Sequence, residues 1–260
     1  MSGAPVAVLD QLLPAAGQGW ELLFQLAEED QENWCLLGGQ MMYLLAAEAG
    51  RRLPRPTPDV DVVVNVRTRK RSTEWLAKWL VGKGFELDEI ALNTEQVGHR
   101  FVRDAEHSPG RVFFDILAPE GLSASTALFT LRPFRTIQAP GTTQALDRSE
   151  LVTVAITDIT GQASSTGQVR RPPLWSALIC KAAATRIVAR DDPERDWQDA
   201  ALALSMLDNP LGTSRMFTRK DRQRVRYLAP LLDARHAAWR PLGSDERDRG
   251  IAALEFLAGG

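Results

Sequence analysis

The chain has 260 residues, 44% of them hydrophobic and 25% charged, which is enough for one large domain or two small ones with a substantial buried core. The formal net charge of −2 argues against a dedicated DNA-binding protein held by bulk electrostatics. No window approaches ~18 uninterrupted apolar residues, and the first residues lack the basic and apolar regions of a secretion signal, so we expect a cytoplasmic protein with no membrane partner.

The N-terminal half is predicted to combine helices and strands. Residues 1–30 show apolar residues at helical spacing around a break at Pro14–Gly19, which predicts one or two amphipathic helices. Residues 34–66 are predicted to form a strand, a helix, a loop and a second strand. Ser72 is predicted to cap a further helix over Thr73–Val81.

Short strands are predicted next, at Phe85–Leu87, Gly98–Val102 and Arg111–Leu117. Residues 118–150 are rich in loop-forming residues. Two more strands are predicted at Gln144–Asp147 and Leu151–Thr157, and a flexible turn is predicted at Thr160–Thr166.

Beyond Pro173 the strand signals vanish, and a proline suits the first turn of a helix. Helices are predicted around Ala177–Ile187, Trp197–Leu207, Arg219–Leu228, Leu231–Trp239 and Ser244–Leu257. The sequence therefore predicts an α+β fold, in which residues 1–170 form a mixed sheet with flanking and N-terminal helices. Residues 171–260 are predicted to form a helical C-terminal domain.

Two aspartates, Asp59 and Asp61, alternate with valines in a predicted strand. In an extended chain such side chains point to the same face, about 6.5–7 Å apart. Two carboxylates held in this way repel each other, and a divalent cation relieves the repulsion. Mg²⁺ prefers such oxygens and also binds the phosphates of substrates, so this strand is a candidate magnesium site.

A glycine pair, Gly38 and Gly39, lies where the predicted strand Trp34–Leu37 runs into a helix. Glycine lacks Cβ, so its backbone can approach a ligand closely. The free N–H groups at the start of a helix also bind anions. This stretch is therefore a candidate phosphate cradle.

A third acid, Asp115, lies inside the strongly apolar segment Arg111–Leu117, where an uncompensated carboxylate is costly. It is either bonded to backbone at a strand end or brought beside Asp59 and Asp61 by strand pairing as a third metal ligand. Arg100 precedes it in another predicted strand, and we expect this arginine to contact a phosphate or, in preference, to pair with a carboxylate.

In the C-terminal half, Lys181 lies on an otherwise apolar helix. It is either a core lysine whose ammonium reaches solvent or a cation that neutralises a triphosphate. Asp196 and Asp199 share one face of the next helix, where acids also complement the helix dipole. Cys35 and Cys180 lie in apolar runs and are expected to be buried, inert thiols.

The acidic and glycine motifs together resemble the signature of the polymerase-beta-type nucleotidyltransferase superfamily, and in particular the AbiEii/AbiGii-like toxin family. The residues that carry the resemblance are Gly38-Gly39 and Arg55-x-Thr57-x-Asp59-x-Asp61, with a looser match at Lys181, Arg186 and Asp196-x-x-Asp199. The similar region runs from about Trp34 to Leu207. Gln40 departs from the small residues common after the glycines, and Asp196 stands where histidine is frequent.

The resemblance implies a Mg²⁺-dependent enzyme that transfers a nucleoside monophosphate from an NTP to an acceptor hydroxyl, as a toxin acting on tRNA or on a protein, with an antitoxin partner. It implies that Gly38 and Gly39 hold phosphate, that Lys181 and Asp196 contact the nucleotide, and that Asp199 assists at the base or acceptor. The implied metal ligands are Asp59, Asp61 and Asp115, and the implied catalytic set is Asp59, Asp61, Asp115, Lys181 and Asp199.

Two other functions compete with this interpretation. One is the modification of a small molecule such as an aminoglycoside, although the arginine-rich segments of the chain do not suit a cationic acceptor. The other is a degenerate, non-catalytic module that binds a nucleotide or a partner protein. An intact pair of carboxylates argues against the second alternative, because a module that has lost catalysis does not need it.

Overall fold

The computed structural model describes residues 7–10, 12, 14–51, 59–88, 96–123, 125–157, 163–187, 192 and 194–259. Arg55 and Thr57 of the motif lie outside these residues. The chain divides into two compact units, Met1–Pro172 and Pro173–Gly260, called unit 1 and unit 2 below. The division falls beside the boundary predicted at residue 170.

Unit 1 is built on a six-stranded main sheet with the strand order β2-β3-β6-β5-β4, and β7 pairs with β6 off this path. The strands are β2 (Trp34–Leu37), β3 (Asp59–Val64), β4 (Glu86–Leu87), β5 (Arg100–Asp104), β6 (Arg111–Pro119) and β7 (Gln138–Ala139). Strand β3 runs parallel to β6 and antiparallel to β2, whereas β5 runs antiparallel to β6 and to β4. The sheet is therefore mixed, which confirms the α+β class.

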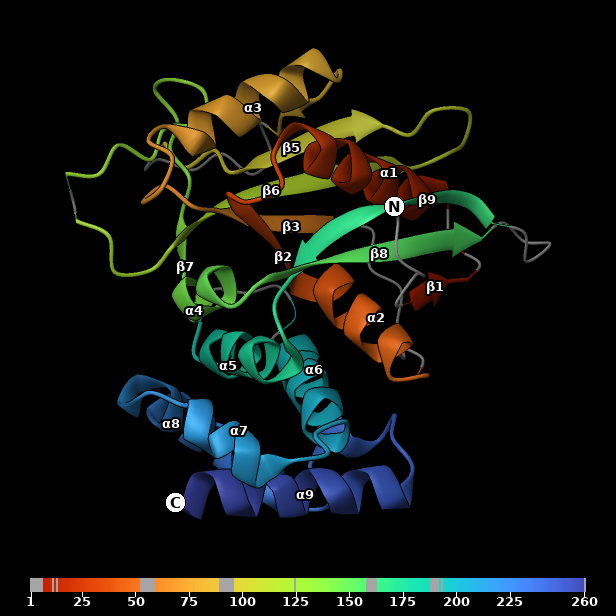
Figure 1. The fold of residues 1–260 in the computed structure, drawn as a ribbon, viewed down its shortest axis with the longest axis vertical. Helices are drawn as coiled ribbons and strands as arrows, with labels where there is room; N and C mark the ends of the chain where they lie inside the picture. Colours follow the sequence, from red (N-terminus) through yellow and green to blue (C-terminus); the bar gives the residue numbers. More distant parts are fainter. Residues whose placement is uncertain are drawn as a thin grey trace. The chain divides into compact units, whose positions relative to one another are not determined.

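Four helices accompany this sheet in the described part of unit 1 (Figure 1). They are α1 (Pro14–Glu29), α2 (Gly38–Glu48), α3 (Ser72–Gly82) and α4 (Thr142–Asp147). Helix α1 contacts β3 and β6, α2 contacts β3, and α3 contacts β6. The buried apolar residues of β2, β3 and β6 pack with those of α1, α2 and α3 in the core of unit 1.

A second, three-stranded sheet in unit 1 has the order β1-β8-β9. Its strands are β1 (Ala7–Leu9), β8 (Glu150–Thr157) and β9 (Ala163–Arg171). The predictions of a helix at residues 7–9 and of a turn at residues 163–166 were wrong; residues 160–162 lie outside the described part. Pairing explains the first error, because β1 lies parallel to β8 with alternating buried and exposed residues, a pattern that three residues cannot reveal locally.

Arg171 joins this second sheet to α2. Its Nε and Nη2 donate to the two carboxylate oxygens of Glu48, both at 2.8 Å, and its Nη1 donates to Glu150 at 3.1 Å. Glu150 is also its cross-strand neighbour in the β8–β9 register. Because a bidentate arginine–carboxylate pair is among the stronger polar contacts in proteins, the last turn of α2 is fastened to the end of β9.

Three further local predictions in unit 1 were wrong. Pro14–Gly19 is not a break, because the proline begins α1 and Gly19 lies within it. A Cβ on Gly19 would lie 2.8 Å from Val60 Cγ2, so the glycine allows α1 to pack closely against β3. Residues 144–147 are helical within α4, which starts after Gly141 in the left-handed region. Ser72 does not cap α3, since Arg71 holds the cap position and Ser72 Oγ is buried without a hydrogen bond to a described residue.

The elements described in unit 2 are helices. They are α5 (Leu174–Ala184), α6 (Glu194–Ser205), α7 (Pro210–Met216), α8 (Arg219–Arg226) and α9 (Ser244–Gly259), with short 3-10 helices at Ala229–Leu232 and Ala237–Trp239. The sequence did not predict α7, and the continuous helix predicted over Leu231–Trp239 was wrong. Trp239 joins the two short turns, because its Nε1 donates to the carbonyl of Leu231 at 2.9 Å.

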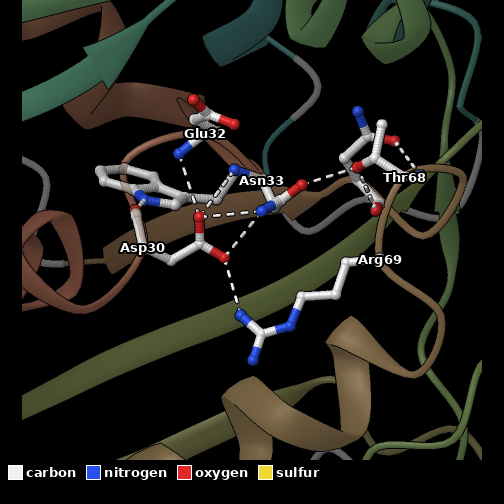
Figure 2. Close-up of polar contacts among 7 residues, drawn as sticks. Asp30, Glu32, Asn33, Thr68 and Arg69 are labelled. Atoms are coloured by element: carbon white, nitrogen blue, oxygen red, sulfur yellow. Dashed lines mark hydrogen bonds and ion pairs between the residues drawn. The ribbon is translucent and has the colours of Figure 1, made fainter.

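Asp30, at the end of α1, organises a polar cluster that Figure 2 shows. Its Oδ1 accepts from the backbone N–H groups of Glu32 and Asn33, both at 3.0 Å, and its Oδ2 accepts from Arg69 at 2.8 Å. The Arg69 guanidinium also lies 4.1 Å from the ring centre of Trp75. Burial acts to raise the pKa of Asp30, but these hydrogen bonds outweigh it and hold the pKa below its usual value.

We predict that Asp30→Asn destabilises the protein at neutral pH. A depressed folded-state pKa means that the ionised carboxylate contributes stability above its unfolded pKa and loses it as pH falls through the lower folded pKa. The variant should therefore lose about 1–2 kcal/mol at pH 7, and the difference should shrink below about pH 4. Urea unfolding at pH 7, 5 and 3 measures this, with the neighbouring exposed Glu29→Gln as control. A deficit that is constant over this pH range would contradict the prediction.

Candidate functional site

The predicted acids of unit 1 lie in one row across the main sheet. In the β3–β6 register Asp61 pairs with Asp115, and in the β5–β6 register Asp115 pairs with Arg100. Directly paired residues project from the same face of a sheet, and Asp59, two residues before Asp61, shares that face. The prediction that strand pairing brings Asp115 beside the other acids is confirmed. Asp59, Asp61, Asp115 and Arg100 are called the Asp–Arg cluster below.

Arg100 forms the closest contacts of the Asp–Arg cluster. Its Nε donates to Asp115 Oδ1 and its Nη2 to Asp115 Oδ2, both at 2.8 Å, while Nη2 lies 3.5 Å from Asp59 Oδ2. The hydrogen bonds to Asp115 raise the pKa of Arg100 above its usual range; burial opposes the rise, and the charges of Asp115, Asp59 and Asp61 add to it. Of the two roles expected for Arg100, pairing with a carboxylate is the one observed.

Asp115 is more buried than Asp59, with 7% of its side chain exposed against 21% for Asp59. It lies in the middle of β6, so the alternative of a strand-end aspartate does not describe it. The guanidinium supplies the compensation that a carboxylate among apolar neighbours requires. Its role as a metal ligand stays a prediction.

His99 lies next to Arg100 in the chain and is partly buried. Burial lowers the pKa of its imidazole; Arg100 adds to the decrease and Asp115 opposes it. Its Nδ1 is buried and makes no hydrogen bond to the described residues. Burial thus disfavours a positive charge on this imidazole beside the Asp–Arg cluster.

Gly38 brings the start of α2 against Asp61. Its φ of +65° lies in the left-handed region, and a Cβ at this position would overlap the carboxylate of Asp61. Leu37 holds the cap position of α2 without a side-chain cap, and Asp61 lies opposite Leu37 in the β2–β3 register. A carboxylate at a helix start is favoured by the helix dipole. The glycine is thus required by Asp61; its role and that of Gly39 in holding phosphate stay predictions.

Gln40, the departure from the family pattern, has a structural role. Its side chain is buried, and its Oε1 accepts a hydrogen bond from Trp20 Nε1 at 2.8 Å. The amide therefore links the first turn of α2 to α1. A serine or threonine at this position would be too short to make the same contact.

We predict that Gly38→Ala is more damaging than Gly50→Ala, although both glycines have a φ of +65°. A Cβ on Gly50 meets no atom within 4 Å, so that variant reports the backbone strain alone, about 1–2 kcal/mol. Gly38→Ala must also displace the Asp61 carboxylate, which adds roughly 1–3 kcal/mol. Urea unfolding of both variants measures the difference, and equal losses would show that Asp61 does not require the glycine.

Unit 2 brings together the three residues that the sequence singled out there. Lys181 Nζ donates a hydrogen bond to Asp196 Oδ1 at 3.2 Å. It also lies 2.7 Å from Asp199 Oδ2, where the two groups form an ion pair without hydrogen-bond geometry. Only 8% of the lysine side chain and 1% of each aspartate side chain are exposed. The arrangement fastens α5 to α6, and the ammonium is held within unit 2 by two carboxylates.

We predict that Lys181→Met costs about 3–5 kcal/mol of stability, because it leaves buried carboxylates without their ammonium. The triple variant Lys181→Met/Asp196→Asn/Asp199→Asn should lose less stability than Lys181→Met alone, since the neutral amides need no counter-charge. Lys78→Met, which breaks an ion pair with Glu74 on a lysine whose side chain is 68% exposed, should cost less than about 1 kcal/mol. Urea unfolding followed by tryptophan fluorescence tests the order; a triple variant no more stable than Lys181→Met would contradict it.

The donor chemistry of the Asp–Arg cluster suits Mg²⁺ with two protein ligands. Asp59 and Asp61 offer the hard oxygens that Mg²⁺ prefers, and the Cβ-free Gly38 leaves room for the carboxylate of Asp61 at the start of α2. Within the described ranges, no three acidic, histidine or cysteine side chains form an arrangement that could hold a metal ion. A cation held by Asp59 and Asp61 stays a prediction.

Comparison with known proteins leaves the family open. The sequence matches no protein-family model, and no curated protein is significantly similar to it. Cys35 and Cys180 are both buried, as predicted. Among the described residues, no helix has the length and apolarity needed to cross a bilayer.

Proposed function

We propose that the chain is a Mg²⁺-dependent nucleotidyltransferase that moves a nucleoside monophosphate from an NTP to an acceptor hydroxyl, with release of pyrophosphate and of the hydroxyl proton. The observation that carries the proposal is the row of acids on β3 and β6 beside the start of α2. Phosphoryl and nucleotidyl transfer require positioning and charge neutralisation more than covalent chemistry. Paired carboxylates next to a helix start can meet both requirements.

Each part of this site has a proposed task. Asp59 and Asp61 would hold the cation together with phosphate oxygens of the NTP, and the N–H groups at Gly38 and Gly39 would bind a phosphate. When bound, Mg²⁺ neutralises the charge of the triphosphate and favours attack by the acceptor oxygen. Arg100 orients Asp115 and adds positive charge on the same face of the sheet.

The finer features belong to the same proposal. They are a nucleotidyltransferase-like sheet, a helical C-terminal domain, and contacts from Lys181, Asp196 and Asp199 to the nucleotide or acceptor. Because Lys181 is held by two carboxylates in unit 2, a contact with a triphosphate requires the ammonium to be shared with them. The proposed acceptor is tRNA or a protein, and an antitoxin is the proposed partner in the cytoplasm.

Transfer of label tests the proposal. The full chain is incubated with each α-³²P-labelled NTP, Mg²⁺ and either total tRNA, a protein extract or an aminoglycoside, and label on the acceptor is measured. We expect label on tRNA or protein, and a loss on the order of a hundredfold or more in Asp61→Asn, because a metal ligand supplies several kcal/mol to the transition state. Asp104→Asn on β5, where 89% of the side chain is exposed, is the matched control and should keep full activity.

The other outcomes separate the competing functions. Label on the aminoglycoside alone would establish small-molecule modification. Mg²⁺-dependent NTP binding without transfer to any acceptor would establish a non-catalytic nucleotide-binding module. Absence of both transfer and NTP binding would show that the proposal is wrong.

A further inference from the structure

A cavity of about 430 Å³ lies in unit 2 where α7, α8 and α9 meet. Helices α7 and α8 both contact α9 (Figure 1). The guanidinium of Arg222 joins the other two helices, because its Nη2 donates to the carbonyl of Ser214 at 3.3 Å. The residues that line the cavity are Ser214, Arg222, Glu255, Phe256, Leu257 and Gly259. Binding sites in proteins have volumes of roughly 300–1,000 Å³, so this hollow is large enough to receive side chains of a bound molecule.

Apolar side chains are exposed around this cavity. Phe256 lines it, and 46% of this residue is exposed. On α7, Leu211 and Met216 are exposed as well, and none of the residues Pro210–Met216 is buried. Leu211 lies one turn before Ser214 and therefore shares the side of α7 that borders the cavity. A ligand confined to the cavity would leave Leu211 exposed, so the apolar surface is wider than a small molecule needs.

A row of arginines on α8 borders the same cavity. Arg219, Arg222 and Arg226 follow one face of the helix at positions i, i+3 and i+7, and Arg222 lines the cavity. None of the three forms an ion pair with a residue that the structure describes. Glu255, the acid of the lining, lies on α9. Positive charge without an acidic partner therefore follows the α8 side of the cavity. The cavity, Leu211 and the arginine row are together called the α7–α9 groove below.

We propose that the α7–α9 groove binds an acidic amphipathic segment of a partner protein. Apolar side chains of the segment fill the cavity beside Phe256 and cover Leu211, as an amphipathic helix does in an apolar groove. Its carboxylates pair with the arginine row, which supplies the complementary charge. The inference concerns unit 2 alone and does not depend on the proposed chemistry of unit 1.

The composition of the groove favours a protein segment over other anions. Single-stranded RNA is bound by successive aromatic side chains on which its bases stack, whereas Phe256 is the aromatic residue of this lining. A membrane surface would be met by the arginine row and by Leu211, but it has no need of a cavity between three helices. A segment with both carboxylates and large apolar side chains uses all three features.

Fluorescence anisotropy with the full chain and labelled synthetic peptides tests the inference. Three helical peptides of about fourteen residues, four turns, carry glutamate on one face and leucine, phenylalanine or tryptophan on the other. A matched version of each carries lysine in place of glutamate. We expect at least one acidic peptide to bind at least roughly tenfold more tightly than its lysine version, and its affinity to fall as salt is raised. No binding by any acidic peptide, or equal binding by the lysine version, would overturn the inference.

The charge of the groove is tested with Arg219→Glu/Arg226→Glu. Both side chains are exposed and the contact of Arg222 is left in place, so the fold should be kept, which circular dichroism checks. The acidic peptide should bind this variant at least roughly tenfold more weakly. Arg240→Glu is the matched control, because Arg240 is exposed and lies just before α9 begins, whereas Phe256 lies near its end. An equal loss in the two variants would contradict a specific site.

The apolar part of the groove is tested with Phe256→Ala, which should weaken binding of the acidic peptide at least about fivefold. Val81→Ala on α3 is the matched control, since this residue is also 46% exposed, and it should bind like the wild type. Unchanged binding in Phe256→Ala would overturn the inference.

Two other anions are measured beside the peptides, namely vesicles that contain phosphatidylserine and single-stranded polyuridylate. We expect both to bind more weakly than the acidic peptide. Tighter binding of either one, lost in Arg219→Glu/Arg226→Glu, would show that the arginine row meets a lipid surface or a nucleic acid, and the inference of a protein partner would be wrong.

Discussion

The parallel pairing of β3 with β6 is the constraint on which the site of unit 1 depends. It places Asp61 opposite Asp115 on one face of a mixed sheet, where the two carboxylates repel each other. Two neighbouring features make the arrangement tolerable. The start of α2 approaches Asp61 through Gly38, and β5 presents Arg100 to Asp115. The dipole of α2 and the guanidinium of Arg100 thus offset the negative charge of the acids on this sheet.

Local chemistry was enough to predict the elements that carry the acids. The buried strand at Trp34–Leu37, the helix that follows it and the alternation of Asp59 and Asp61 with valines are all readable from spacing, because burial and period act within a few residues. The short strand β1 and the helix α4 could not be predicted from the local sequence. The first depends on pairing with β8, far along the chain, and the second on a turn at Gly141.

The partners of the charged residues could not be predicted from the sequence. Spacing placed Arg100 in a strand but left two roles open, because only the β5–β6 register decides that Asp115 lies opposite it. Gln40 was noted as a departure from a pattern, and its bond to Trp20 depends on how α1 packs. For Lys181 the helical spacing of Asp196 and Asp199 was a usable signal, since both acids lie on one face and reach the same ammonium.

The position of Arg171 bears on how the two units can be separated. It is the last residue of β9 and lies directly before Pro172, where unit 1 ends. A shortened chain ending at residue 170, the boundary predicted from the sequence, would lack this guanidinium and leave the carboxylates of Glu48 and Glu150 without it at the end of α2. A chain ending at Pro172 would keep it. Two residues at the cut therefore decide whether an isolated N-terminal fragment keeps the Arg171 contacts that hold the end of α2 to the second sheet.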